Sequence, residues 1–457
     1  MGAFCATVAL WCLFGGLRNQ KGESKMNADS INMTLPPFLQ GVRVVGKLSD
    51  RLADMVREHN NSFNGEEPPE IEVTSEAQPV MFMSPDLLEA HSKSDYNKIL
   101  EIEKQSQDEL RPVYEAISEH GKDAWFEAYE ESTGTTFYMA FNDNAVLWLY
   151  PHKTEEVISE TGEIKYKKVV SIGSYVSGSG NTILGTLGLT SVGRVAIELI
   201  LGMVFTALVT ELVKKITGQS ISALLNAIAA RMGLTVTFVV RGIIAGILKF
   251  TVLTVLTFLG SLFVNWIISL FDKTFYVQLD VYNWDDASGW RAGGNYKDNA
   301  KIVGEDDFTK FILAKKKVPE VPPFIEKIVI KDIAVEYGTI TWQNDSTFAQ
   351  GLGVALQLLR DVGGGFAWAL DCPWARDTVH CADDGVVGDI ANYFKTAKFR
   401  KDLSFKITSS GIPIQFSLNA VSGAENNLYR ARIDIGHIDE QKIGRQCCGT
   451  GRLPEHS

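Results

Sequence analysis

The sequence is short of positive charge and lacks the short motifs that mark common catalytic sites. Its 44 Lys and Arg residues are outnumbered by 55 Asp and Glu residues, which gives a formal net charge of −11. A nucleic-acid partner needs a basic face to neutralise its phosphates, so this balance argues against one. The chain also has no Gly-x-Ser-x-Gly, His-Glu-x-x-His, P-loop or Cys-x-x-Cys motif. The sequence therefore predicts a protein that is not an enzyme and has no cofactor, metal or catalytic residues.

Cysteine is also scarce, with six residues in 457. That number is too small for a scaffold built on disulfides. Cys372 and Cys381 are close enough in sequence to form a local disulfide, and two reduced thiols fit the pattern equally well. Residues 1–25 include an apolar stretch from Ala3 to Leu17 without a preceding positive charge. A signal-like segment and a disordered segment both remain open there, and so does secretion.

Proline is absent from Val195 to Phe271, and charge is nearly absent. A segment without proline can stay helical over long stretches. Phe250 to Phe271 carries no charge, and its 22 residues would span about 33 Å as a helix, against about 30 Å for a bilayer core. We expect this stretch to enter a membrane. The predicted membrane-inserting residues are Phe250, Leu253, Leu256, Leu259, Phe263, Trp266, Ile267 and Leu270.

The neighbouring apolar stretches are less suited to a permanent span. Glu198 and Glu211 interrupt the first stretch and Arg241 interrupts a later one. A charge at the bilayer centre costs roughly 2.5–3.5 kcal/mol on insertion scales. This mixture favours helices that can pack in a bundle and be released. Permanent membrane residence, conditional insertion and a buried soluble core all remain open.

The polar regions on either side predict a multidomain α+β protein. Tyr96 to Ser118 has the composition of a helix, and Thr135 to Phe141 with Ala145 to Tyr150 reads as a β-hairpin. After Asp272, short alternating runs separated by turn residues are typical of an antiparallel β-sandwich. The expected regions are a signal-like or disordered 1–25, a mixed α/β 26–170, a hydrophobic helical bundle 181–273, a β-sandwich 274–440 and a tail 441–457.

The segment Gly365-Phe-Ala-Trp-Ala-Leu-Asp371-Cys-Pro-Trp374 resembles the aegerolysins, and the general strand pattern is also similar to actinoporin-like sandwiches. The sequence departs from the aegerolysins at Ala375-Arg376, where that family has a Gly-Ser pair. The resemblance implies a lipid-recognising β-sandwich over Phe275 to Asp439, in a family of membrane-binding proteins of which some form pores with a larger partner. Trp and Tyr rings suit the headgroup layer. The predicted lipid-binding residues are Trp284, Trp290, Tyr296 and Trp374.

Together these features predict a membrane-active, pore-forming-type protein similar to a cytolysin or toxin. The sandwich would dock on membrane lipid, the apolar helices would insert, and the inserted chains would form a homo-oligomer. The protein would then be membrane-associated. The alternative is a constitutive integral membrane protein with a structural or signalling role and no catalytic activity. Partition into detergent before contact with vesicles, or only after it, separates these two hypotheses.

Overall fold

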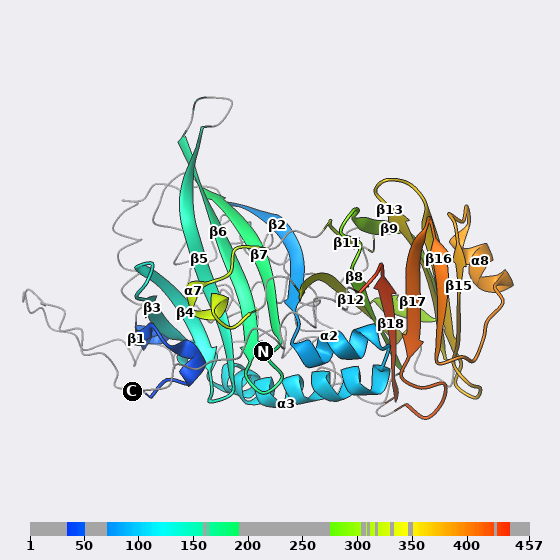
Figure 1. Cartoon of the computed structure of the whole chain (residues 1–457), viewed down its shortest axis with the longest axis horizontal. Helices are drawn as coiled ribbons and strands as arrows, with labels where there is room; N and C mark the ends of the chain where they lie inside the picture. The colour runs from blue at the N-terminus through cyan, green and yellow to red at the C-terminus, as the bar shows by residue number, and fades with distance from the viewer. Residues whose placement is uncertain are drawn as a thin grey trace, which may run out of the picture.

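The computed structural model describes residues 34–50, 71–158, 164–191, 275–302, 311–315, 319–329, 333–345, 351–424 and 427–438, together with residues 162 and 308. Within these residues the chain builds a 13-stranded sheet and a 5-stranded sheet (Figure 1). The larger sheet runs in the order β1-β3-β4-β5-β6-β7-β2-β12-β8-β18-β17-β16, with β10 paired to β12. The smaller sheet runs β11-β9-β13-β14-β15.

The N-terminal half of the large sheet is an antiparallel meander from β3 to β7. Its β4–β5 turn is closed by the Asn142 side chain, whose Oδ1 accepts hydrogen bonds from the backbone N–H groups of Asn144 and Ala145. This pairing confirms the hairpin expected there. The strands of this half are β1 (Val42–Lys47), β2 (Ile71–Phe82), β3 (Phe126–Glu130), β4 (Thr135–Phe141), β5 (Ala145–Ile158), β6 (Ile164–Val176) and β7 (Thr182–Ser191).

Aromatic rings fill the core of the N-terminal half. Phe137 stacks on Phe324 with 5.0 Å between ring centroids, and Trp148 meets the same ring edge-on at 5.6 Å. Trp148 lies flat over Gly173, where an added Cβ would come 2.0 Å from the indole Cζ2 atom. Position 173 therefore needs glycine, because any side chain would displace the largest ring of this core.

The C-terminal half of the chain is a β-sandwich, and one of its two sheets continues the large N-terminal sheet. β12 pairs with β2 on one side and with β8 on the other, so the two halves share a hydrogen-bonded sheet. The sandwich strands are β8 (Tyr276–Asn283), β9 (Trp290–Asp298), β10 (Ala300–Ile302), β11 (Ile312–Leu313), β12 (Ala334–Asn344), β13 (Leu352–Arg360), β14 (Gly365–Cys372), β15 (Val379–Asp384), β16 (Ser404–Ser409), β17 (Ile412–Leu418) and β18 (Leu428–Ile435).

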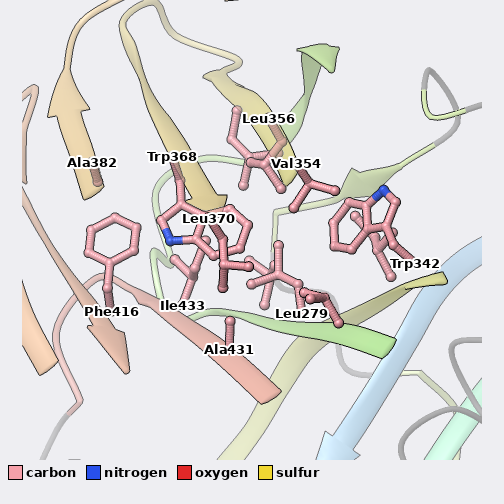
Figure 2. Close-up of a cluster of buried hydrophobic side chains, with 14 of the residues drawn as sticks. Leu279, Trp342, Val354, Leu356, Trp368, Leu370, Ala382, Phe416, Ala431 and Ile433 are labelled. Atoms are coloured by element: carbon pink, nitrogen blue, oxygen red, sulfur yellow. The ribbon is translucent and has the colours of Figure 1, made fainter. Parts of the chain in front are cut away.

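The core of the sandwich is apolar. Leu279 of β8 and Ile433 of β18 have no exposed surface, and they belong to the same cluster as Trp368 and Leu370 of the facing sheet (Figure 2). Burying a large apolar side chain of this kind contributes about 1.5–3 kcal/mol. This cluster therefore holds the two sheets together.

Two helices lie beneath both halves of the molecule (Figure 1). α2 (Pro85–Ser92) begins at Ser84, whose Oγ accepts a hydrogen bond from the Leu87 N–H at 3.3 Å. α3 (Tyr96–His120) contacts the N-terminal half through Ser106, which donates to Ser179 at 2.7 Å. The shorter helices are η1 (Pro37–Leu39), η2 (Gly121–Ala124), α7 (Pro323–Glu326) and α8 (Ile390–Thr396).

The expected fold class is wrong. The described residues are mostly strands, and the N-terminal strands share a sheet with the sandwich. No central helical bundle occurs among them, and the expected helical region 181–273 opens with strand β7. Its sequence Thr182-Ile-Leu-Gly-Thr-Leu-Gly-Leu-Thr-Ser191 places small and β-branched residues beside apolar ones, which suits a strand. The high hydrophobicity of the whole region 181–273 led to the expectation of helices and hid this strand pattern.

The rest of the apolar region, residues 192–274, lies outside the described residues, and so do all eight predicted membrane-inserting side chains. Residues 1–33 and 439–457, which include the signal-like segment and the tail, are outside them as well. None of the helices in the described ranges is both long enough and apolar enough to cross a bilayer.

Candidate functional site

An exposed tryptophan marks the end of the sandwich where β14 finishes and β8 begins. Trp374 is 56% exposed, and its ring meets the ring of Phe275 edge-on with 5.1 Å between centroids. Phe275 is buried and stacks in turn on Tyr429. The exposed indole is therefore supported from below by a buried aromatic pair.

Three loops meet at the end of the sandwich that carries Trp374. The Lys401 ammonium lies 2.8 Å from the Asp377 carboxylate, and the Thr378 N–H donates to the Val421 carbonyl at 2.6 Å. The Leu418 N–H donates to the carbonyl of Leu403, whose side chain is 52% exposed. We call this surface the Trp374 end and define it as residues 373–378, 399–403 and 419–424. It presents Trp374 and Leu403 side chains to solvent.

The local sequence explains why the chain turns here. Pro373 has no N–H to donate, so it ends the pairing of β14 after Cys372. Gly351, the residue before the partner strand β13, lies close to the end of β14, and an added Cβ there would lie 1.9 Å from the Cys372 carbonyl oxygen. A tight strand end thus leads directly into Trp374 and holds the start of its loop in place.

The other three predicted lipid-binding residues lie elsewhere. Trp290 has no exposed surface and packs on Phe366 in the sandwich core. Trp284 is partly buried and donates from Nε1 to Asp434 at 3.1 Å. Tyr296 packs on Phe394 of α8 with 5.2 Å between centroids. The four residues do not form one surface in this structure, and Trp374 is the one with most of its surface exposed. Their contact with lipid stays a prediction.

The local disulfide between Cys372 and Cys381 is not formed. Both are free, buried thiols. Cys381 pairs with Ala369 across β14 and β15, so Cys372, three residues further along β14, points to the opposite face. Cys372 belongs to the sandwich core, and Cys381 lies under Tyr393 of α8. The sheet itself separates the two sulfur atoms.

A second feature is a buried network of charges, which we call the polar interface. It lies between helices α2 and α3 and the outer face of strands β12, β8 and β18. Arg430 donates from Nη2 to Glu103 of α3 at 2.5 Å and to Asp280 of β8 at 3.1 Å. The other oxygen of Asp280 accepts hydrogen bonds from Tyr337 at 3.1 Å and Thr339 at 2.8 Å. The network therefore ties α3 to three strands.

The second half of the polar interface is centred on Asp434. Its Oδ1 atom lies 3.0 Å from Nδ1 of His91 in α2, and its Oδ2 lies 2.8 Å from Nε of Arg432. Burial tends to raise the pKa of Asp434, but Arg432 and His91 outweigh burial and lower this pKa to about 2. Burial lowers the pKa of His91, although Asp434 opposes this effect. Because an ionised carboxylate can only accept, the His91 hydrogen lies on Nδ1.

Sequence reasoning missed this network. β18 reads Leu-Tyr-Arg-Ala-Arg-Ile-Asp-Ile, so Arg430, Arg432 and Asp434 share one face and apolar residues share the other. Such alternation usually marks a solvent-exposed face. The one available signal was the amphipathic sequence of 96–120, since a helix with an apolar stripe needs a surface to cover.

No family model matches the chain, and no curated protein matches it. Several solved structures resemble part of it. The lectin XCL of Xerocomus chrysenteron is 12% identical, with a match that covers 36% of this chain and 100% of the lectin at a TM-score of 0.24. The lipid binding protein Nakanori is 9% identical over 38% of this chain and 76% of that protein, with a TM-score of 0.28. IP-1A from Alcaligenes faecalis is 15% identical over 36% of this chain and 94% of that protein, with a TM-score of 0.19. At these TM-scores the function must be argued from the chain's own residues.

Proposed function

We propose that this protein binds lipid bilayers, docking through the Trp374 end of its sandwich and then inserting the apolar segment from Val195 to Phe271. The observation that carries the proposal is the exposed Trp374 ring on Phe275. Phe275 follows the end of the apolar segment by four residues. Tryptophan suits the boundary between headgroups and acyl chains, because its ring is apolar and its N–H is polar.

Docking by this surface alone would be weak. Trp374 and Leu403 are about half exposed. Each therefore contributes about half of the roughly 1.5–3 kcal/mol that a fully exposed large apolar side chain gains on leaving water. That is less than the marginal, reversible anchoring given by a single myristoyl chain. Stable attachment therefore needs a second element. The uncharged stretch from Phe250 to Phe271 supplies it, at about 0.8 kcal/mol for each methylene that enters hydrocarbon.

Docking is followed by insertion and association in the membrane. Insertion is conditional rather than constitutive, the inserted chains associate into a pore, and the protein acts by binding rather than by catalysis. The place of action is a membrane. Insertion is favoured over permanent residence because Glu198, Glu211 and Arg241 stand where a permanent span would avoid charge.

Co-sedimentation with vesicles tests the docking step. We expect the purified chain to bind vesicles, and Trp374→Ala to weaken binding by about tenfold, the equivalent of about 1.4 kcal/mol. Val386→Ala is a matched control, because Val386 is 61% exposed at the opposite end of the sandwich. Equal binding by parent and Trp374→Ala would remove the Trp374 end from the proposal.

Release of a trapped dye tests insertion and pore formation. We expect leakage from dye-loaded vesicles across a range of pH and lipid composition, and partition into detergent only after exposure to vesicles. Vesicles that stay sealed under all these conditions while the chain remains in solution would refute insertion. A chain that needs detergent from the start would instead support a constitutive integral membrane protein.

A further inference from the structure

An unusually basic segment adjoins the Trp374 end in a chain whose net charge is −11. The end of α8 and the connection from it towards β16 carry four cationic residues in seven positions, and all four are exposed. We call residues 395–401 the basic segment; its cations are Lys395, Lys398, Arg400 and Lys401. Arg376, two residues after Trp374, is exposed as well.

The backbone of the basic segment is fixed against the sandwich. Arg400 and His380 exchange two backbone hydrogen bonds, at 3.0 and 3.1 Å. The ring of Phe399 packs edge-on against Phe394 with 5.5 Å between centroids. The Arg400 guanidinium lies 4.4 Å from the centre of the Phe405 ring. The segment is therefore a positioned part of the surface rather than a loose charged loop.

Few acidic groups offset these cations. Asp377 pairs with Lys401 at 2.8 Å, yet the Lys401 side chain remains 70% exposed. Asp402 is the other acidic residue beside the segment, and it is exposed. Arg376 adds a fifth cation and lies near a third carboxylate, Asp371. Five cations then face three carboxylates, so the local charge is still positive where the whole chain is negative.

We propose that the basic segment contacts anionic lipid headgroups when the Trp374 end docks on a bilayer. This inference rests on the proposed docking function and adds its lipid class. The exposed Trp374 and Leu403 side chains adjoin the cations through the Lys401–Asp377 pair and the 399–403 loop. A bilayer offers both acyl chains for the apolar residues and phosphates for the cations. A soluble polyanion offers phosphates alone and leaves the exposed apolar side chains without a partner.

The test compares two vesicle compositions, phosphatidylcholine alone and an equimolar mixture of phosphatidylcholine and phosphatidylserine. We expect the full chain to bind the mixed vesicles more tightly, with a preference that falls as salt is added. Each lysine near an anionic surface is worth roughly fivefold in binding. The triple variant Lys395→Gln, Lys398→Gln and Lys401→Gln should therefore lose about a hundredfold on mixed vesicles and little on phosphatidylcholine.

A matched triple variant controls for net charge. Lys47→Gln, Lys104→Gln and Lys327→Gln remove three exposed lysines from other surfaces, and this variant should keep the preference. Equal binding of the parent to both vesicle compositions would overturn the lipid class while leaving docking intact. Failure to bind either composition would refute docking itself. Binding to double-stranded DNA as tight as binding to mixed vesicles, at the same salt, would overturn the assignment to lipid.

Discussion

Strands β8 and β18 have two buried faces that differ in kind. One face, with Leu279 and Ile433, packs into the apolar sandwich core. The other, with Asp280 and Arg430, meets helices α2 and α3 through charges. An apolar face stabilises in proportion to the area it removes from water. A buried charged face stabilises only while every partner is present, because a lone buried charge is costly. The apolar face of these strands therefore tolerates the loss of a single partner better than the charged face does.

Removing the shared cation should have the largest effect. Arg430→Met leaves Glu103 and Asp280 without their common partner. We expect a loss of about 3–5 kcal/mol in the free energy of unfolding, measured by urea denaturation. Arg291→Met, at an exposed position of β9, is the control. The double variant Glu103→Met, Arg430→Met should be more stable than Arg430→Met alone. A less stable double variant would contradict the account of unpaired charge.

Leu279→Ala probes the other face of the same strand. The side chain is fully buried among the sandwich core residues. Truncation leaves a cavity, and we expect a loss of about 3 kcal/mol in the free energy of unfolding. A second substitution that removes a neighbouring side chain should not restore the lost free energy of unfolding, since no charge is left unpaired. If such a substitution restored stability, the apolar face would respond to mutation in the same way as the charged face, which would contradict the comparison.

The pH dependence of stability reflects the charged face, where burial shifts the pKa values of two groups. Burial lowers the pKa of His91 below its ordinary 6.5, so the unfolded chain takes up this proton at higher pH than the folded chain. The contribution of neutral His91 is complete above pH 6.5 and is lost as the pH falls towards the lowered pKa. Burial raises the pKa of Glu103, and this effect acts in the opposite direction. The comparison must therefore be with His91→Gln.

Below pH 6.5 the parent should lose stability faster than His91→Gln. Urea unfolding at a series of pH values measures the difference. Parallel curves for the two proteins would show that His91 has the same pKa in the folded and unfolded chain.

The smallest effect on stability should come from Trp374→Ala. The ring is 56% exposed and contacts Phe275 from outside. We expect a change within about 0.5 kcal/mol in the free energy of unfolding, typical of surface sites, beside the tenfold loss of vesicle binding. A large loss in the free energy of unfolding would show that the Trp374 ring stabilises the fold, and would contradict its assignment as a docking residue.

Local patterns in the sequence predicted local structure. The hairpin around Asn142 and the strands of the sandwich are present because alternation and turn residues act over a few positions. The shared sheet depends on pairing between Val80–Phe82 and Ala334–Glu336, and no pattern within either segment indicates the other. The polar interface was hidden for the same reason, since Glu103 and Arg430 are 327 residues apart.

The candidate docking residues were predicted by type, and type does not fix exposure. Trp290 and Trp374 are the same amino acid, yet one has no exposed surface and the other is 56% exposed. The difference comes from position, because Trp290 begins strand β9 with its ring facing Phe366, whereas Trp374 follows Pro373 out of a strand. The sequence analysis did not single out the basic segment, and its closeness to Trp374 appears only through the Lys401–Asp377 contact.

The junction between the two halves has a mechanical consequence. β12 pairs with β2 over three residues, Ala334 to Glu336, and its far end, Trp342 to Asn344, pairs with β10, while β8 runs along its other side. Backbone pairing between β2 and β12 therefore joins the two halves through only three residue pairs within the described residues. α3 runs across this junction and is fastened on one side by Ser106 and on the other by Glu103. Within the described residues this helix therefore bridges the two halves beside the sheet, and we expect loss of the Glu103–Arg430 contact to weaken that bridge while the β2–β12 pairing stays intact.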